Sequence, residues 1–236
     1  MEVVVRRFGL EPIPESVMRL THLIARQNAD LEAISHVITQ DPMLTARLLR
    51  MTRRPGKSEP PEDQLAVETA LMRSGLGLVF LLAMGDLLMR ALIKTFNVMV
   101  SIQLEMVNPR DVPPINEEHM LCEIDFWGKA VGKIQMRLSE KTGRVLAGRM
   151  LGVLPESLSS SGEKDDAVNE LGNMVAGNFL SNLADAGLPC RLTVPIVYRT
   201  SEFTIRSVPR GICERMAFRS PEANMFLDIS VNPWND

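Results

Sequence analysis

The chain has 236 residues, 45% hydrophobic and 23% charged, which is enough for one large or two small domains with hydrophobic cores. Its formal net charge of -3 gives no general attraction to nucleic acid or to an anionic membrane. The composition therefore disfavours binding of a polyanion by the whole chain, although it leaves a local basic patch open.

Cysteine and histidine are too few and too scattered to suggest a metal site. The cysteines Cys122, Cys190 and Cys213 lie far apart, no C-x-x-C occurs, and the three histidines do not cluster with them. We therefore expect no metal bound by Cys and His. Free thiols suit a reducing cytoplasm.

Neither the start of the chain nor its most apolar run predicts a membrane segment. The N-terminal residues MEVVVRRFGLEPIP lack the long apolar core and the small-residue cleavage site of a signal peptide. The run LGLVFLLAM, residues 76–84, is closed by Gly85 and Asp86 and is shorter than the roughly 20 residues that span a bilayer. We expect a buried helix there, no membrane span and a cytoplasmic location.

The first third of the chain is predicted to be helical. Apolar residues recur at helical spacing in residues 11–27 and again in residues 31–40. Asp41 and Pro42 are typical of the N-cap and first position of a third helix. A polar, proline-rich loop is expected over residues 53–63, followed by helices over residues 64–74 and 76–84.

Beyond Gly85 the pattern changes from helices alone to helices and strands. One more helix is expected over residues 86–100. It is followed by a strand at 100–107, a hairpin around Gly128, a short helix at 140–152, a polar loop and a long helix at 166–187. Three further strands are expected at 191–199, 212–218 and 224–231. The connections are short, so the strands should be mostly antiparallel, and this part is predicted to be α+β.

The long helix contains the stretch DDAVNELGNMVAGNFL, residues 165–180, in which polar residues recur along one side. At about 100° per residue, Asp166, Glu170, Asn173 and Gly177 form one narrow stripe, and the apolar residues lie on the other side. Such a stripe taken alone is more often only a solvated surface. Asn178 falls within the apolar arc and is expected to be a structural asparagine.

Two acidic residues stand at the expected start of this helix. Asp165 and Asp166 are expected to favour the helix N-terminus, where negative charge is stabilising.

The order of elements around this helix is similar to that of a known family. A hairpin, a short helix, a helix with D-x-x-x-E-x-x-N and a strand containing Pro195 follow one another. This order resembles the CheX branch of the CheC/CheX/FliY family of chemotaxis phosphatases, over roughly residues 86–232. Asp166, Glu170 and Asn173 match the family's D/S-x-x-x-E-x-x-N motif, which occurs once here.

The resemblance implies dephosphorylation of the phospho-aspartate of a CheY-like response regulator in bacterial two-component signalling. Asn173 would orient the attacking water and Glu170 would pair with a lysine of the regulator, so these two are the catalytic candidates. Asp166 and Gly177 are the partner-binding candidates. The regulator would hold Mg²⁺, and no cofactor or metal is expected on this chain. The family also leads us to expect a homodimer through this domain.

The N-terminal segment resembles the start of an HDOD domain, a helical signalling module, over roughly residues 8–84. The stretch from Asp41 to Arg50, DPMLTARLLR, carries most of this resemblance. No His-Asp dipeptide occurs, so phosphohydrolase chemistry is not expected, and His22 and His36 should be surface or packed residues. The segment could serve as an accessory bundle or as a docking or sensing module.

The overall prediction is an α+β chain. A small helical bundle (residues 1–84) is followed by a CheX-like domain (residues 85–236) whose antiparallel sheet packs against two long helices. Two other functions stay open: a non-catalytic adaptor that binds a response regulator or another signalling partner through the same helix, and a structural dimerisation module. The presence of both Glu170 and Asn173 favours the phosphatase.

Overall fold

The computed structural model describes residues 12–24, 30–52, 64–115, 117–158 and 161–232. The polar loop predicted at residues 53–63 and the first eleven residues lie outside this range. The helices and strands of the described residues have these bounds, in chain order. They are α1 (Glu15–Ile24), α2 (Leu31–Thr39), α3 (Pro42–Thr52), α4 (Gln64–Met99), β1 (Glu105–Val107), η1 (Pro109–Asp111), β2 (His119–Gly128), β3 (Val131–Leu138), α5 (Glu140–Leu151), η2 (Pro155–Ser157), α6 (Ser161–Asp185), β4 (Cys190–Leu192), β5 (Ile196–Thr200), β6 (Ile212–Arg219) and β7 (Asn224–Asn232).

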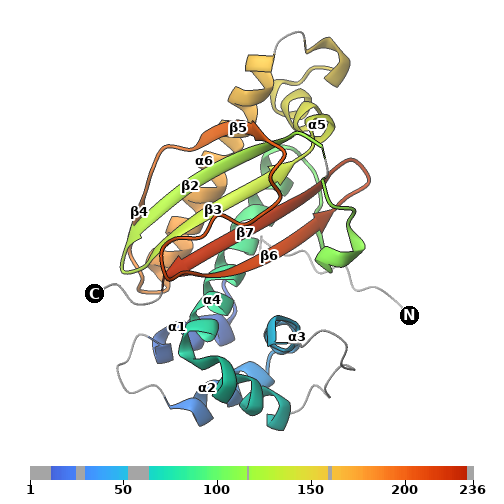
Figure 1. Cartoon of the computed structure of the whole chain (residues 1–236). Coiled ribbons are helices and arrows are strands. Elements are labelled where there is room, and N and C mark those ends of the chain that lie inside the picture. Colours follow the sequence, from blue (N-terminus) through green and yellow to red (C-terminus); the bar gives the residue numbers. More distant parts are fainter. Residues whose placement is uncertain (1–11, 25–29, 53–63, 116, 159–160, 233–236) are drawn as a thin grey trace.

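The N-terminal helices form a small bundle around the first part of α4, as predicted (Figure 1). Asp41 precedes α3 and its Oδ1 accepts from the backbone N–H groups of Met43 and Leu44, so its role as the N-cap is confirmed. His22 and His36 lie exposed on α1 and α2, which confirms that they are surface residues.

Helix α4 confirms one predicted boundary and corrects another. The predicted division between Ser74 and Leu76 is confirmed, because the backbone of Gly75 (φ 73°, ψ 178°) is not helical and separates two helices within α4. The second of these helices does not end at Met84, as predicted, but continues to Met99. The helix end predicted at Gly85 was wrong, because a contact with residues distant in sequence requires a glycine there. A Cβ at position 85 would overlap the side chains of Arg47 and Glu214, so this glycine provides space for a close contact and does not end the helix. The predicted domain boundary between residues 84 and 85 falls inside this helix and stays a prediction.

A buried ion cluster joins the helical bundle to the sheet. Arg47 of α3 donates from Nε and Nη2 to the two carboxylate oxygens of Glu214 in β6, at 3.1 and 2.6 Å. Asp86 of α4 accepts from Arg90 at 2.7 Å and lies 3.7 Å from Arg47 Nη1. The side chains of Arg47 and Glu214 are only 1% and 3% exposed. The bundle and the sheet therefore share an interior.

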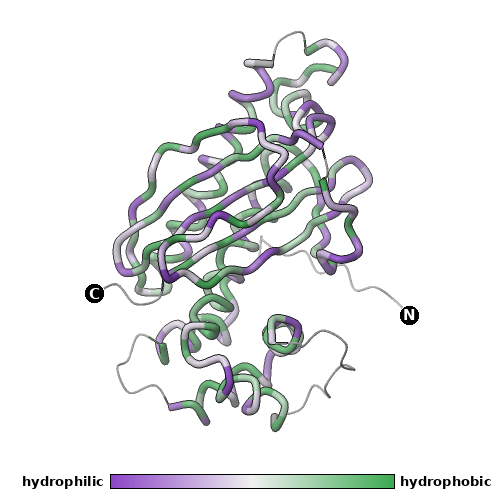
Figure 2. Tube along the Cα trace, in the orientation of Figure 1, coloured by the Kyte–Doolittle hydropathy of each residue, from purple (hydrophilic) through white to green (hydrophobic). Residues whose placement is uncertain are grey.

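Helix α4 is long and apolar enough to cross a membrane by length and composition, but 83% of its most apolar window is buried in this fold. Figure 2 shows its hydrophobic course where it passes from the bundle to the sheet. Its apolar surface is used by the bundle at one end and by the sheet and α6 at the other. The prediction of a buried helix at residues 76–84 is thus confirmed.

Within the described residues, all strands pair antiparallel in one seven-stranded sheet, in the order β1-β6-β7-β3-β2-β4, with β5 also paired to β2. The predicted hairpin is β2–β3, with Gly128 at its turn. The two long helices α4 and α6 cover one face of the sheet (Figure 1). This arrangement confirms the predicted α+β fold.

Two predicted strands differ from the structure. Residues 100–104 alternate between buried and exposed as a strand would, but only Glu105–Val107 pairs with β6. The strand predicted at 191–199 is divided into β4 and β5 at Pro195, which has no N–H to donate. Here Ile124 and Asp125 of β2 face three residues, 193–195, so the break is a β-bulge on an edge strand.

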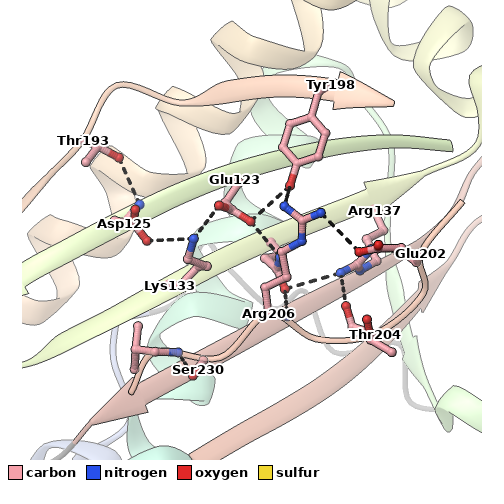
Figure 3. A network of polar contacts seen from close by, with 12 residues as sticks. Glu123, Asp125, Lys133, Arg137, Thr193, Tyr198, Glu202, Thr204, Arg206 and Ser230 are labelled. Carbon is pink, nitrogen blue, oxygen red and sulfur yellow. Dashed lines mark hydrogen bonds and ion pairs between the residues drawn. The ribbon is translucent and has the colours of Figure 1, made fainter. Parts of the chain in front are cut away.

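The other face of the sheet is crossed by the segment between β5 and β6 and carries a polar network (Figure 3). Arg137 of β3 donates to the carbonyl oxygens of Glu202 and Thr204, at 2.8 and 2.6 Å, and to the carboxylate of Asp228 at 2.9 Å. These bonds satisfy the backbone of the crossing segment and a buried carboxylate. We assign this network a structural role.

Candidate functional site

The polar stripe predicted on the long helix is present on α6. Asp166, Glu170, Asn173 and Gly177 are all exposed. The residues on the opposite side of the helix are buried, namely Val168, Leu171, Val175, Phe179 and Leu183. The predicted geometry of the stripe is therefore correct, and the stripe faces away from the core.

Helix α6 packs closely against strand β2 of the sheet. A Cβ at Gly172 would overlap the Cys122 thiol of β2, so the helix lies directly on the strand. Further along, the rings of Phe179 and Phe126 meet edge to face, with centroids 5.5 Å apart. Burial raises the pKa of the Cys122 thiol to about 12, and Glu123 adds to this rise, so the thiol stays protonated and acts as a packing group.

Two carboxamides fix α6 against α4 from the side. Asn178 donates from Nδ2 to the Thr95 hydroxyl, and Asn182 donates to the Leu87 carbonyl oxygen, both at 2.9 Å. The prediction that Asn178 is structural is confirmed. The same role for Asn182 was missed, although its spacing of four residues from Asn178 places it on the same side of the helix.

An ion-pair network anchors the N-terminal part of α6 to β5 and α5. Arg199 of β5 donates to Asp165 Oδ2 and to Glu140 Oε1, each at 2.7 Å, and Lys164 donates to Glu140 Oε2 at 2.6 Å. Burial by itself raises the pKa of Glu140, but the hydrogen bonds from Lys164 and Arg199 outweigh burial and hold that pKa below its ordinary value of 4.5. This anchor was not predicted because Arg199 and Asp165 are 34 residues apart in sequence.

The network also corrects the role expected for the acidic pair at the helix start. Helix α6 begins at Ser161, so Asp165 and Asp166 lie in its second turn, beyond the first turn in which negative charge stabilises a helix N-terminus. Asp165 is used by Arg199, whereas Asp166 points outward on the stripe.

The three polar side chains of the stripe are free to bind something else. Among the described residues, none forms a hydrogen bond or ion pair with Asp166, Glu170 or Asn173. The described residues also contain no group of three or more His, Cys, Asp or Glu that could hold a metal ion. The stripe therefore offers two carboxylates and one carboxamide, on successive turns of a helix fixed on three sides, to a partner that approaches from outside.

The glycine of the stripe differs from the glycine that faces the sheet. A Cβ at Gly177 meets nothing within 4 Å, whereas a Cβ at Gly172 overlaps Cys122. We expect Gly177→Ala to raise the free energy of unfolding by about 0.5–1 kcal/mol, because alanine is the better helix former. We expect Gly172→Ala to lower it by about 1–3 kcal/mol through overpacking. Urea unfolding of the two variants measures both values, and a change of the same sign in both would contradict this description of α6.

The two parts of the chain are similar to two different protein families. Residues 120–216 match the family model described as chemotaxis phosphatase CheX, and residues 10–105 match that of the HDOD domain. The HDOD match thus continues about twenty residues beyond the end that we predicted at residue 84. A comparison with curated proteins found no match.

Several solved structures share the fold of the second part. The chemotaxis protein CheX from Vibrio vulnificus is 25% identical with a TM-score of 0.54, and the match covers 63% of this chain and 99% of that one. A CheC-like superfamily protein from Shewanella sp. PV-4 is 24% identical with a TM-score of 0.55, covering 63% and 97%. The CheX–CheY–BeF3–Mg²⁺ complex from Borrelia burgdorferi matches at 18% identity and a TM-score of 0.51, covering 62% and 96%.

Both resemblances drawn from the sequence are therefore confirmed. Pro195, the expected proline of the strand after the helix, lies buried in the bulge between β4 and β5. The chain joins an HDOD-like helical segment to a CheX-like part. Helix α4 lies within the HDOD match and also packs against α6 and the sheet.

Proposed function

We propose that the chain removes the phosphoryl group from the phospho-aspartate of a CheY-like response regulator. The observation that carries this proposal is the pair Glu170 and Asn173, exposed one turn apart and without a partner among the described residues, on the fixed helix of a CheX-like fold. The relative from Borrelia burgdorferi, which shares this fold, forms a complex with CheY.

An acyl phosphate needs little covalent help from a phosphatase. A water molecule attacks the phosphorus atom, and the bond between phosphorus and the aspartyl oxygen breaks. The oxygen and both protons of the water leave with the phosphoryl group as dihydrogen phosphate, and the aspartate carboxylate is restored. The restored carboxylate is a good leaving group, so the task is to place the water in line with the breaking bond. This chain supplies no nucleophile in the proposed reaction, and Mg²⁺ is held by the regulator.

Asn173 is proposed to orient the water. Its carboxamide oxygen accepts a hydrogen bond from the water, its amide group donates elsewhere, and neither titrates near neutral pH. Asn173 is exposed, so it can enter the active site of a partner without unfolding its own helix.

Glu170 is proposed to pair with the lysine next to the phosphoryl site of the regulator, which sets the register of the complex. Gly177, one turn beyond Asn173, leaves room for the partner. A Cβ added there would meet no atom of this chain within 4 Å, so the surface at this position is open. Asp166 continues the acidic end of the stripe and is proposed to add to partner binding.

Replacing Glu170 tests its assigned role. We expect Glu170→Ala to raise the concentration of regulator needed for half-maximal dephosphorylation by about tenfold or more, because a hydrogen bond to a charged group contributes roughly 1.5–3 kcal/mol. The measurement is the rate of phosphoryl loss against concentration of a Mg²⁺-loaded, phosphorylated CheY-like regulator. An unchanged half-saturation would remove Glu170 from the site. Binding of the regulator by wild type without any phosphoryl loss would favour the adaptor.

A homodimer through the CheX-like domain stays a prediction, as does a cytoplasmic location. The edge of the sheet at the bulge exposes Val194 and Ile196, at 77% and 64%, which is an apolar edge that a second copy could cover.

A further inference from the structure

A row of polar side chains on α6 meets the stripe at Asn173. Asp165, Asn169 and Asn173 follow one another at intervals of four residues, so each side chain is the neighbour of the next along the helix. At about 100° per residue, successive members are rotated by about 40°. The row therefore leads from the buried flank of α6 next to β5 to the exposed position of Asn173.

Two acceptors in this row are buried and unused. Asp165 accepts from Arg199 through Oδ2, at 2.7 Å, and its Oδ1 has no hydrogen-bond partner among the residues that the structure describes. The carbonyl oxygen of Asn169, Oδ1, is also buried and has no partner within the same part of the chain. A buried acceptor that stays unsatisfied has lost its hydrogen bonds to water and gained none in return, so each such atom requires an explanation.

We propose that Asn169 is a positioning residue for Asn173, an inference that rests on the proposed phosphatase function. In the productive complex the row forms a chain of hydrogen bonds with a single direction. The Asn169 amide donates to Asp165 Oδ1, and the Asn173 amide donates to Asn169 Oδ1. Arg199 fixes the far end, because its guanidinium donates and cannot accept.

The direction of this chain determines which end of the Asn173 carboxamide points outward. An exposed asparagine can present either its oxygen or its amide group. Once its amide group donates to Asn169, the oxygen is the atom left to accept a hydrogen bond from the attacking water. Asn169 thus selects the orientation of Asn173 that the reaction requires, without contact with the substrate itself.

Asn169→Ala tests this assignment by separating catalysis from stability. With CheY phosphorylated by acetyl phosphate in the presence of Mg²⁺, we expect kcat to fall by about tenfold while KM changes little, because the water is misplaced but the docking surface is intact. The melting temperature should stay the same or rise, because the change removes a buried unsatisfied carbonyl and introduces the best helix former. Asn224→Ala, the same change at an exposed asparagine at the start of β7, is the matched control and should leave kcat unchanged.

A double-mutant cycle with Asn173→Ala gives a readout that a purely structural role would not affect. If Asn169 acts through Asn173, adding Asn169→Ala to Asn173→Ala causes no further loss of kcat. Additive losses, or full kcat in Asn169→Ala, would overturn the inference while Asn173→Ala still identifies the phosphatase. Absence of phosphoryl loss with wild type would instead reject the proposed function itself, and this inference with it.

Discussion

Replacing Glu214 by alanine should lower the free energy of unfolding by about 3–5 kcal/mol, the range expected when one partner of a buried ion pair is removed. Arg47, which is only 1% exposed, would then remain buried without the Glu214 carboxylate that it binds. A guanidinium cannot escape this cost by losing its proton, because the arginine pKa is too high. The neighbouring Asp86 lies 3.7 Å from Arg47 and already binds Arg90, so it offers little compensation.

The matched control is an ion pair at the surface. Glu222 binds Arg149 at 2.6 Å, but both side chains are more than 40% exposed and solvent screens the pair, so Glu222→Ala should change the free energy of unfolding far less than Glu214→Ala. The double variant Arg47→Met/Glu214→Leu should recover most of the loss, since it removes both charges and fills the space. Urea unfolding of the variants measures these values. Equal effects of Glu214→Ala and Glu222→Ala would show that the buried pair does not hold the bundle to the sheet.

Replacing Asn173 by alanine should lower kcat by about 100-fold, the cost expected if the proposed function is right and Asn173 places the attacking water. The side chain is exposed and has no partner among the described residues, so the fold and the melting temperature should not change. Regulator binding should persist through Glu170, which makes the defect one of kcat and not of KM. Stopped-flow measurement of phosphoryl loss gives both constants, and a loss confined to KM would move Asn173 from the chemical step to docking.

The local geometry of the site could be predicted from the sequence because it follows from helical periodicity. Asp166, Glu170, Asn173 and Gly177 share a stripe in any α-helix, and the buried residues of α6 are the apolar ones apart from Lys164 and Gly172. The structural role of Asn178 followed from its place in the apolar arc, although its partner Thr95 could not be named. Patterns with a short range were therefore sufficient for the exposed half of the site.

The missed features depend on residues that are distant in sequence. Gly85 is typical of a helix end, yet it is needed because Arg47 and Glu214 meet above it, and those two residues are 167 positions apart. Arg199 has no local pattern that links it to Asp165. Asn169 was overlooked because its significance lies in a buried, unpaired oxygen, which only the packed structure reveals.

The central claim is that this chain catalyses phosphoryl hydrolysis with Asn173. The most direct measurement is phosphate release from Mg²⁺-loaded, phosphorylated CheY-like regulator present in large excess over the chain. Wild type should release many phosphates per chain well above the spontaneous rate, and Asn173→Ala should fall close to that rate while Asn224→Ala matches wild type. A wild-type rate equal to that of buffer alone, or to that of Asn173→Ala, would contradict the claim.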